Sequence, residues 1–182
     1  MTMSHQKHTE AVYDLNTIKK QAKQSLANGS VTDDYALDIK EACNHLNAAL
    51  ATEIMCVLRY RHHQIIAKGI AKPQVAAEFL EHALDEERHM MMIAERINQL
   101  GGDPDFNPST VQQRTTTEYG SGRDLLKLIE EDLIAERIAI MVYRKLIDWF
   151  GEKDPTTRRM LEDILKDEED HADDLSDLLS TK

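Results

Sequence analysis

The sequence has few of the residues that interrupt helices or build short strands. Its 182 residues include 7 glycines and 4 prolines, and aromatic residues make up only 5%. A sandwich or barrel of many short strands needs more turn residues than this. Cysteine is also scarce, because only Cys43 and Cys56 are present. In one continuous helix their sulfurs would be separated by about 20 Å along the axis, too far for a disulfide. We therefore expect a helical chain with reduced thiols.

Long apolar runs and an excess of basic charge are also missing. No stretch has the length of a membrane span or of a signal-peptide core. Lys plus Arg number 22 and Asp plus Glu number 33, which gives a formal charge of −11. Such a charge repels phosphate and disfavours a general nucleic-acid or anionic-membrane binder. These absences predict a cytoplasmic protein without a membrane partner, of a size that suits one hydrophobic core.

What is present is a set of long stretches with helical periodicity. We expect residues 1–30 to form an arm with a short amphipathic helix, and residues 34–182 to form the main domain. Within that domain, breaker residues define four long helices, at about 34–68, 73–101, 123–150 and from 155 almost to the C-terminus. A polar loop over 103–122 is long enough to cross a bundle end. The pattern predicts an all-α fold, a four-helix bundle with a long crossover between its second and third helices.

The inward stripe of each long helix carries a glutamate near its middle. Apolar residues recur along these stripes at alternating spacings of three and four, which is typical of a buried helix face. In the third helix, for example, the stripe includes Leu126, Ile129 and Tyr143. Two of the four glutamates are followed by a histidine three residues later. The resulting candidate residues are Glu53, Glu86, His89, Glu136, Glu168 and His171.

The two halves of the domain repeat one chemical pattern. Residues 85–89 (Asp-Glu-Glu-Arg-His) recur 82 positions later as residues 167–171 (Asp-Glu-Glu-Asp-His). A Glu-x6-Tyr pair precedes each of them, as Glu53 with Tyr60 and as Glu136 with Tyr143. Two helical hairpins related by a pseudo-twofold axis would bring the four glutamates and two histidines together at the bundle centre.

Four glutamates on apolar stripes require compensating positive charge. Each desolvated carboxylate costs several kcal/mol unless it is paired, and four together repel one another. No Lys or Arg lies on the same stripes. Two divalent cations would balance the four negative charges, and histidines at i+3 would complete their coordination. An oxygen-rich ligand set with two nitrogens suits Fe or Mn.

These residues also resemble a known family. Glu53 with Tyr60, Glu86-x-x-His89, Asp132-Leu133-x-x-Glu136 and Glu168-x-x-His171 follow the order of the bacterioferritin ferroxidase motifs, and the resemblance covers about residues 40–180. It implies a ferritin-like fold with Glu53 and Glu136 as terminal ligands and Glu86 and Glu168 as bridging ligands. It further implies one imidazole per metal, from His89 and His171, and Tyr60 as a partner just behind the ligands. The implied reaction is oxidation of two Fe(II) by O2 or H2O2, followed by storage of ferric mineral in a cage.

Two departures from bacterioferritin refine this expectation. Glu87 stands where bacterioferritin has its haem-ligating methionine, so haem is not expected there. Only 11 residues follow His171, which leaves no room for the fifth helix of 24-subunit ferritins. The chain ends therefore look more like those of the 12-subunit Dps (miniferritin) cages. We expect a bacterioferritin-type site on a Dps-like homo-oligomer of 12 chains rather than 24.

Two alternatives remain open at this point. One is a di-metal redox enzyme with Mn or Fe, such as a catalase or peroxidase. The other is a Dps-like shell that protects DNA, with lysines of the arm as weak candidate contacts: Lys7, Lys19, Lys20 and Lys23.

His63 and His82 lie a turn or more from the centre and are expected to be core histidines rather than ligands of a third metal. Cys56 is expected to be a small buried hydrophobic residue.

Overall fold

The computed structural model describes residues 12–69 and 71–180, and every structural statement below concerns these residues. Lys7, a candidate DNA contact, lies outside them. The described secondary structure is entirely helical. Contacts divide the chain into two units, residues 1–35 and residues 36–182, each of which is described by itself.

The N-terminal unit contains helix α1 (Leu15–Gln21) and a single 3₁₀ turn (Leu26–Asn28). Asp14 caps α1 by accepting a hydrogen bond from the backbone N–H of Asn16 at 3.0 Å. The helix ends five residues before Leu26, the last position of the predicted amphipathic stripe. None of its residues is buried. A short helix with no buried side chain gains little stability from packing. This lack of packing explains why α1 does not extend further.

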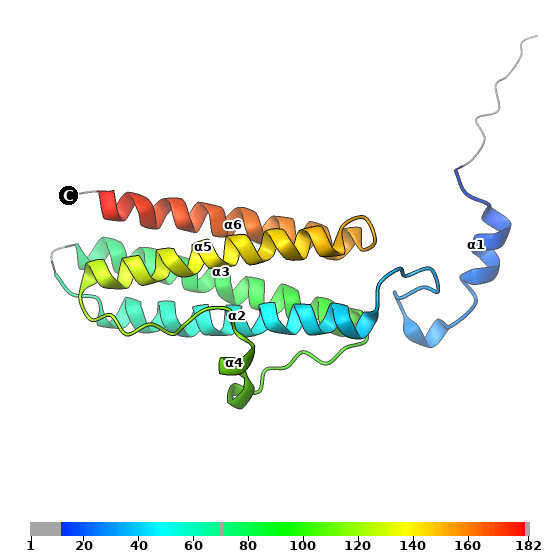
Figure 1. Ribbon diagram of the computed structural model, residues 1–182, viewed down its shortest axis with the longest axis horizontal. Coiled ribbons are helices and arrows are strands. Elements are labelled where there is room, and N and C mark those ends of the chain that lie inside the picture. The colour runs from blue at the N-terminus through cyan, green and yellow to red at the C-terminus, as the bar shows by residue number, and fades with distance from the viewer. Residues whose placement is uncertain (1–11, 70, 181–182) are drawn as a thin grey trace, which may run out of the picture. The chain divides into compact units, whose positions relative to one another are not determined.

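The second unit is a bundle of four long helices, α2 (Ile39–Ile66), α3 (Lys72–Gln99), α5 (Leu125–Phe150) and α6 (Pro155–Ser180). Figure 1 shows α2 with α3 and α5 with α6 as two antiparallel hairpins packed side by side. Helices α3 and α5 run in the same direction, so the segment between them travels the length of the bundle. The predicted four-helix bundle with a long crossover is confirmed.

The start of α2 differs from the prediction because another aspartate caps it. The Asp38 side chain accepts a hydrogen bond from the Glu41 backbone N–H at 2.8 Å. Asp34, the predicted start, instead accepts a hydrogen bond from the Thr32 hydroxyl in the preceding turn. Both aspartates have a side chain that can cap a helix N-terminus, and only the tertiary structure determines which of them does so.

The crossover contains one helix that the sequence did not predict, α4 (Pro108–Arg114). Its apolar anchor is Val111, which is buried in a small cluster with Met55 of α2. Arg114 donates a hydrogen bond to the backbone carbonyl of Asn47 at 2.7 Å. A single apolar residue in a polar segment gives almost no periodic signal, which explains why this helix was missed.

The predicted inward stripes are buried or half-buried, except at Leu126 of α5. The stripe positions predicted for α2 and α3 are all at most 3% exposed: Leu46, Ala49, Glu53, Cys56, Tyr60 and His63 in α2, and Phe79, His82, Glu86, His89, Ile93 and Ile97 in α3. Leu126 is 47% exposed, so its placement on the inward face was wrong. The buried face of α5 begins at Leu128 and Ile129, one turn further along. Both cysteines are buried and free, and Cys56 is 2% exposed, as expected of a small core residue.

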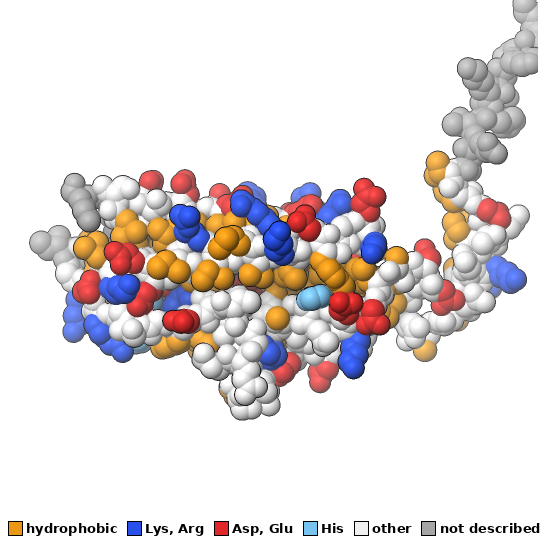
Figure 2. All heavy atoms as spheres, in the orientation of Figure 1, with side chains coloured by type: hydrophobic (Ala, Val, Ile, Leu, Met, Phe, Trp, Pro, Cys, Tyr) orange, Lys and Arg blue, Asp and Glu red, His pale blue; other side chains and the backbone are white. Residues whose placement is uncertain are grey.

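The bundle surface includes an apolar face along α5 and α2. Figure 2 shows hydrophobic side chains gathered there in a continuous band. Met141 and Ile134 are 59% and 55% exposed. A shallow pocket on this face is lined mostly by apolar side chains of α5, among them Ile138, Val142 and Trp149. Taken over the described residues, none of the helices combines the length and apolar character needed to cross a membrane.

Candidate metal centre

The six predicted ligands come from all four long helices and meet inside the bundle. Helix α2 contributes Glu53 and α5 contributes Glu136, whereas α3 and α6 each contribute a Glu-x-x-His pair. Residues three apart lie on the same helix face, so each pair presents both side chains inward. The exposed fractions are at most 4% for the whole set: Glu53, Glu86, His89, Glu136, Glu168 and His171.

The six side chains form two groups that share two carboxylates. One group is Glu53, Glu86, His89 and Glu168, and the other is Glu86, Glu136, Glu168 and His171. In each group, one potential ligand atom per residue lies within 4.8 Å of all the others. Glu86 and Glu168 belong to both groups. Their position between the groups is that of bridging carboxylates in a two-metal site.

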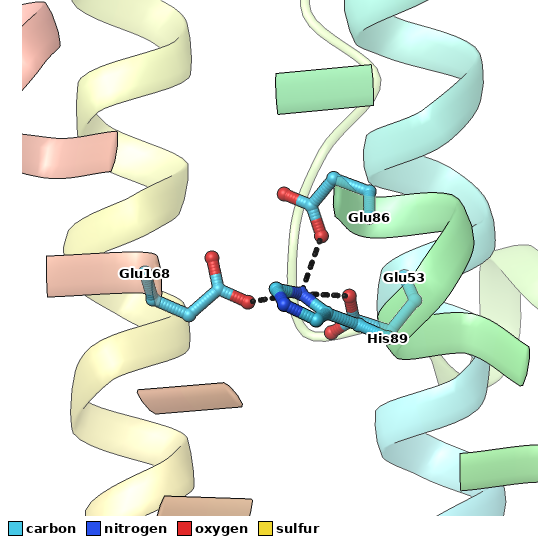
Figure 3. Close-up of side chains that lie close together, drawn as sticks. All are labelled: Glu53, Glu86, His89 and Glu168. Atoms are coloured by element: carbon cyan, nitrogen blue, oxygen red, sulfur yellow. Dashed lines mark ion pairs between the residues drawn. The ribbon is translucent and has the colours of Figure 1, made fainter. Parts of the chain in front are cut away.

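Figure 3 shows the first group around the imidazole of His89. His89 Nδ1 lies 3.3 Å from Glu168 Oε1 and 3.6 Å from Glu53 Oε2. The same nitrogen lies 3.7 Å from Glu86 Oε2. In the second group, His171 Nδ1 lies 3.6 Å from Glu168 Oε2. The atoms therefore face one another at separations too long for good hydrogen bonds, around a common point.

The donor atoms of the centre are buried without hydrogen-bond partners among the described residues. They comprise six carboxylate oxygens and two imidazole nitrogens: Glu53 Oε2, both oxygens of Glu86, Glu136 Oε2, both oxygens of Glu168, His89 Nδ1 and His171 Nδ1. Buried polar atoms are normally satisfied, so eight orphaned atoms converging on one region point to cations. Carboxylate oxygens with one imidazole nitrogen per group fit Fe(II) or Mn(II).

Two tyrosines hold the outer oxygens of the terminal glutamates. The Tyr60 hydroxyl donates a hydrogen bond to Glu136 Oε1, and the Tyr143 hydroxyl donates one to Glu53 Oε1. Each tyrosine therefore contacts the glutamate of the other half of the repeat. The resemblance implied a role for Tyr60 alone, but the structure places both tyrosines in equivalent positions.

Two aspartates that precede the motif glutamates orient the histidines. His89 Nε2 lies 3.3 Å from Asp167 Oδ2, and His171 Nε2 lies 3.4 Å from Asp85 Oδ2. Arg88 joins the two aspartates, with Nη2 3.0 Å from Asp85 and 2.6 Å from Asp167. A carboxylate on the far nitrogen fixes the orientation of a ligating imidazole and raises its basicity. Both aspartates belong to the repeated pentapeptide, but the repeat alone does not indicate their role.

A buried ion pair behind the centre was also missed. Arg59 is 1% exposed, and its Nε lies 2.7 Å from Asp132 Oδ1. Asp132 Oδ2 lies 2.8 Å from His63 Nδ1, so His63 is a satisfied core histidine, as expected. Arg59 also donates a hydrogen bond to Thr117 of the crossover at 2.9 Å. Arg59 and Arg61 both flank Tyr60 of the inward stripe, so the sequence alone does not show which of the two is buried.

The electrostatics of the centre are those of crowded carboxylates. Burial and the neighbouring carboxylates, Glu168 first, raise the pKa of Glu86 well above its usual range. Burial and Glu168 likewise raise the pKa of Glu136. Burial opposes protonation of His89, but the carboxylates of Glu168, Glu53 and Glu86, which face the imidazole, raise its pKa far more. A divalent ion would replace these protons as the source of positive charge.

Two other predicted residues lie outside the six-residue centre. The Glu87 side chain is 54% exposed, and Glu87 Oε2 lies 3.6 Å from Arg61. His82 is buried, and its ring stacks on that of His171 with centroids 4.1 Å apart. Burial and the charge of His171 lower the pKa of His82 to about 3, which keeps its imidazole neutral.

Comparison with known proteins places the chain in a family. A nutrient stress-induced DNA-binding protein from Synechococcus sp. is 30% identical over 138 residues, covering 72% of this chain and 77% of that protein. A bacterioferritin from Rhodobacter capsulatus is 29% identical over 136 residues, covering 74% and 80%. Among solved structures, a dodecameric thioferritin, the bacterioferritin-related protein from Bacteroides fragilis, gives a TM-score of 0.76 at 33% identity, covering 79% and 87%.

The fold, the repeated Glu-x-x-His pairs and these relatives lead to one assignment, which confirms the resemblance seen in the sequence. The model of the ferritin-like domain family matches residues 43–182, which include all four bundle helices from the fifth residue of α2 onward. The chain belongs to the ferritin-like domain family.

Proposed function

We propose that this chain is an iron-storage and iron-detoxification protein with a di-iron ferroxidase centre inside each subunit. The observation that carries the proposal is the convergence of eight unpartnered, buried ligand atoms from two groups that share Glu86 and Glu168. Two bacterioferritin-type Glu-x-x-His pairs supply the shared carboxylates. The relative named bacterioferritin supports the same assignment.

In this proposal, Fe(II) is the substrate and the six residues position it. Glu53 and Glu136 each bind one ion, Glu86 and Glu168 bind both, and His89 and His171 add one nitrogen per ion. Two Fe(II) supply two electrons, which together with two protons from water reduce one O2 to H2O2 or one H2O2 to two waters. The anionic ligands favour the Fe(III) product over Fe(II), because they stabilise the higher positive charge.

The decisive test is stopped-flow oxidation of Fe(II), added at two ions per chain under nitrogen and then mixed with O2 or H2O2. Glu86→Ala should slow the fast phase at least about 100-fold, since the change removes a ligand shared by both ions. Glu87→Ala provides a matched control, because Glu87 is a half-exposed neighbour on the same helix. An unaltered fast phase in Glu86→Ala would refute the assignment. Electron microscopy after further Fe(II) additions should show mineral cores.

We further propose that the subunits assemble into a homo-oligomeric cage of 12 chains. The exposed apolar band along α5 and α2 is a surface that a partner chain would cover. The Bacteroides fragilis protein, which is dodecameric, shares the fold at 33% identity. The two buried free thiols and the acidic charge are in keeping with a cytoplasmic protein.

A DNA-protecting shell is the second candidate function, and one observation favours it. Two relatives, from Synechococcus sp. and Nostoc sp., are named nutrient stress-induced DNA-binding proteins, at 30% and 31% identity. The arm over residues 1–30 carries Lys19, Lys20 and Lys23, which are exposed. A DNA mobility shift that weakens with rising salt and disappears in the triple lysine-to-glutamine variant would establish this function.

Metal analysis of the purified protein would distinguish iron from manganese.

A further inference from the structure

A second cluster of potential metal ligands lies beside the di-metal centre. His82 Nε2 is 3.4 Å from Glu78 Oε1 and 3.8 Å from Asp174 Oδ2. Glu78 and His82 are one turn apart on α3, and Asp174 faces them from α6. These three side chains, one nitrogen and two carboxylates, meet the distance criterion for holding one ion.

The His82 imidazole is buried and aimed at the two carboxylates. The residue is 1% exposed, and its Nε2 has no hydrogen-bond partner among the described residues. Its other nitrogen, Nδ1, lies 3.3 Å from the Tyr60 hydroxyl. The Tyr60 hydroxyl already donates its proton to Glu136, so His82 Nδ1 must be the donor in the contact with Tyr60. With Nδ1 directed at Tyr60, the other ring nitrogen, Nε2, faces the carboxylates of Glu78 and Asp174.

The surroundings of His82 Nε2 are strongly negative. Burial and the neighbouring carboxylates of Asp174 and Glu81 raise the pKa of Glu78. The negative charges of these side chains therefore repel one another. A water-accessible pocket of about 240 Å³ opens at the cluster, and its lining includes five carboxylates and one arginine. His82, Asp174 and the di-metal ligand His171 all line this pocket. His82 Nε2 has no hydrogen-bond partner among the described residues, and a cation would stabilise this nitrogen together with the two carboxylates that face it.

We propose that Glu78, His82 and Asp174 bind a third divalent metal ion, on the pocket side of His171. This proposal revises the sequence-based expectation that His82 is only a core histidine. One imidazole and two carboxylates favour borderline ions such as Fe(II), Co(II) and Zn(II), with water completing the coordination. Because His82 stacks on His171, the third ion would lie next to the di-metal centre. An ion held by His82 would be the next one available to the di-metal centre.

The test is a Co(II) titration of the full-length protein, freed of metal beforehand, followed by calorimetry and by the visible absorption of bound Co(II). The unaltered chain should bind three Co(II), and Glu78→Gln and Asp174→Asn should each bind two. Asp173→Asn is the matched control, because it makes the same charge change at an exposed neighbour on α6. It should still bind three.

Two further measurements distinguish loss of the third ion from loss of the ions in the di-metal centre. Glu86→Ala should lose Co(II) from the di-metal centre and retain the ion that Asp174→Asn loses, so failure of the di-iron proposal would leave this one testable. Crystals soaked with Co(II) should show an anomalous peak within about 2.3 Å of His82 Nε2. Two ions per chain in the unaltered protein, unchanged in Asp174→Asn, together with no peak at His82, would overturn the proposal.

Discussion

At the scale of single residues, the proposed ligands of the centre are held in place by polar partners. The terminal glutamates are oriented by Tyr60 and Tyr143, and the histidines by Asp85 and Asp167. These four residues repeat across the two halves of the bundle, as the ligands do. The repeat therefore includes the partners of the ligands as well as the ligands themselves.

Removing the Tyr60 hydroxyl should destabilise the metal-free protein. Tyr60→Phe leaves one oxygen of Glu136 buried without its donor, which costs about 1–3 kcal/mol. The free energy of unfolding, measured by urea titration with a chelator present, should fall by that amount. Tyr143→Phe should behave alike, whereas Tyr119→Phe, at a 40% exposed position, should change stability by less than about 0.5 kcal/mol. Equal effects at Tyr60 and Tyr119 would contradict this account of the centre.

The depressed pKa of His82 predicts a pH dependence of stability. Burial and His171 lower this pKa to about 3 in the folded metal-free protein, from about 6.5 when unfolded. Between these values the unfolded chain binds a proton that the folded chain does not, so stability is lost as pH falls from 6.5 towards 3. Relative to His82→Gln, the unaltered protein should lose about 1.4 kcal/mol per pH unit in this window. A constant difference between pH 6.5 and 4.5 would contradict the prediction.

At the scale of helices, the buried Arg59–Asp132 pair links α2 to α5, and Arg59 also binds the crossover. Asp132→Ala would leave the Arg59 guanidinium buried without its carboxylate, which costs about 3–5 kcal/mol. Thermal unfolding of the metal-free protein should shift down accordingly. Arg159→Ala breaks an exposed pair with Asp163 and should cost less than about 1 kcal/mol. Comparable losses in the two variants would show that the pair is not a structural link.

The helices also show what sequence reasoning can and cannot resolve. Periodicity predicted the four long helices and the inward position of Glu53, Glu86, Glu136 and Glu168, because a buried stripe leaves a strong three-and-four pattern. It failed for Leu126, where an apolar residue lies outside the buried face. Helix ends depend on which of several possible caps is used, a choice that tertiary contacts make.

Contacts between side chains of different helices could not be predicted from the sequence, for a different reason. The Glu-x-x-His spacing is local, so it can be read along one chain segment. The contacts of Tyr143 with Glu53 and of Asp85 with His171 join residues 90 and 86 positions apart. Nothing local distinguishes these side chains from ordinary core or surface residues. The same holds for the cluster around His82, which needs Asp174 from another helix.

At the scale of the whole molecule, the proposed cage gives a defined mass. Twelve chains of 20.8 kDa amount to about 250 kDa, and 24 chains would amount to about 500 kDa. Light scattering coupled to size exclusion should give the lower value. Replacing Met141 and Ile134 of the apolar band by glutamate should shift the protein to smaller species, because charges would then be buried at the contact. A protein of about 500 kDa would contradict the 12-chain assembly.

The central claim is that four glutamates and two histidines hold two iron ions at the middle of the bundle. Anomalous diffraction at the iron edge, from crystals loaded with Fe(II) under nitrogen, tests it most directly. The account predicts two peaks about 3.5–4 Å apart, lying between Glu86 and Glu168, with one nearest His89 and the other nearest His171. Iron bound only at surface carboxylates, with no peak between Glu86 and Glu168, would contradict it.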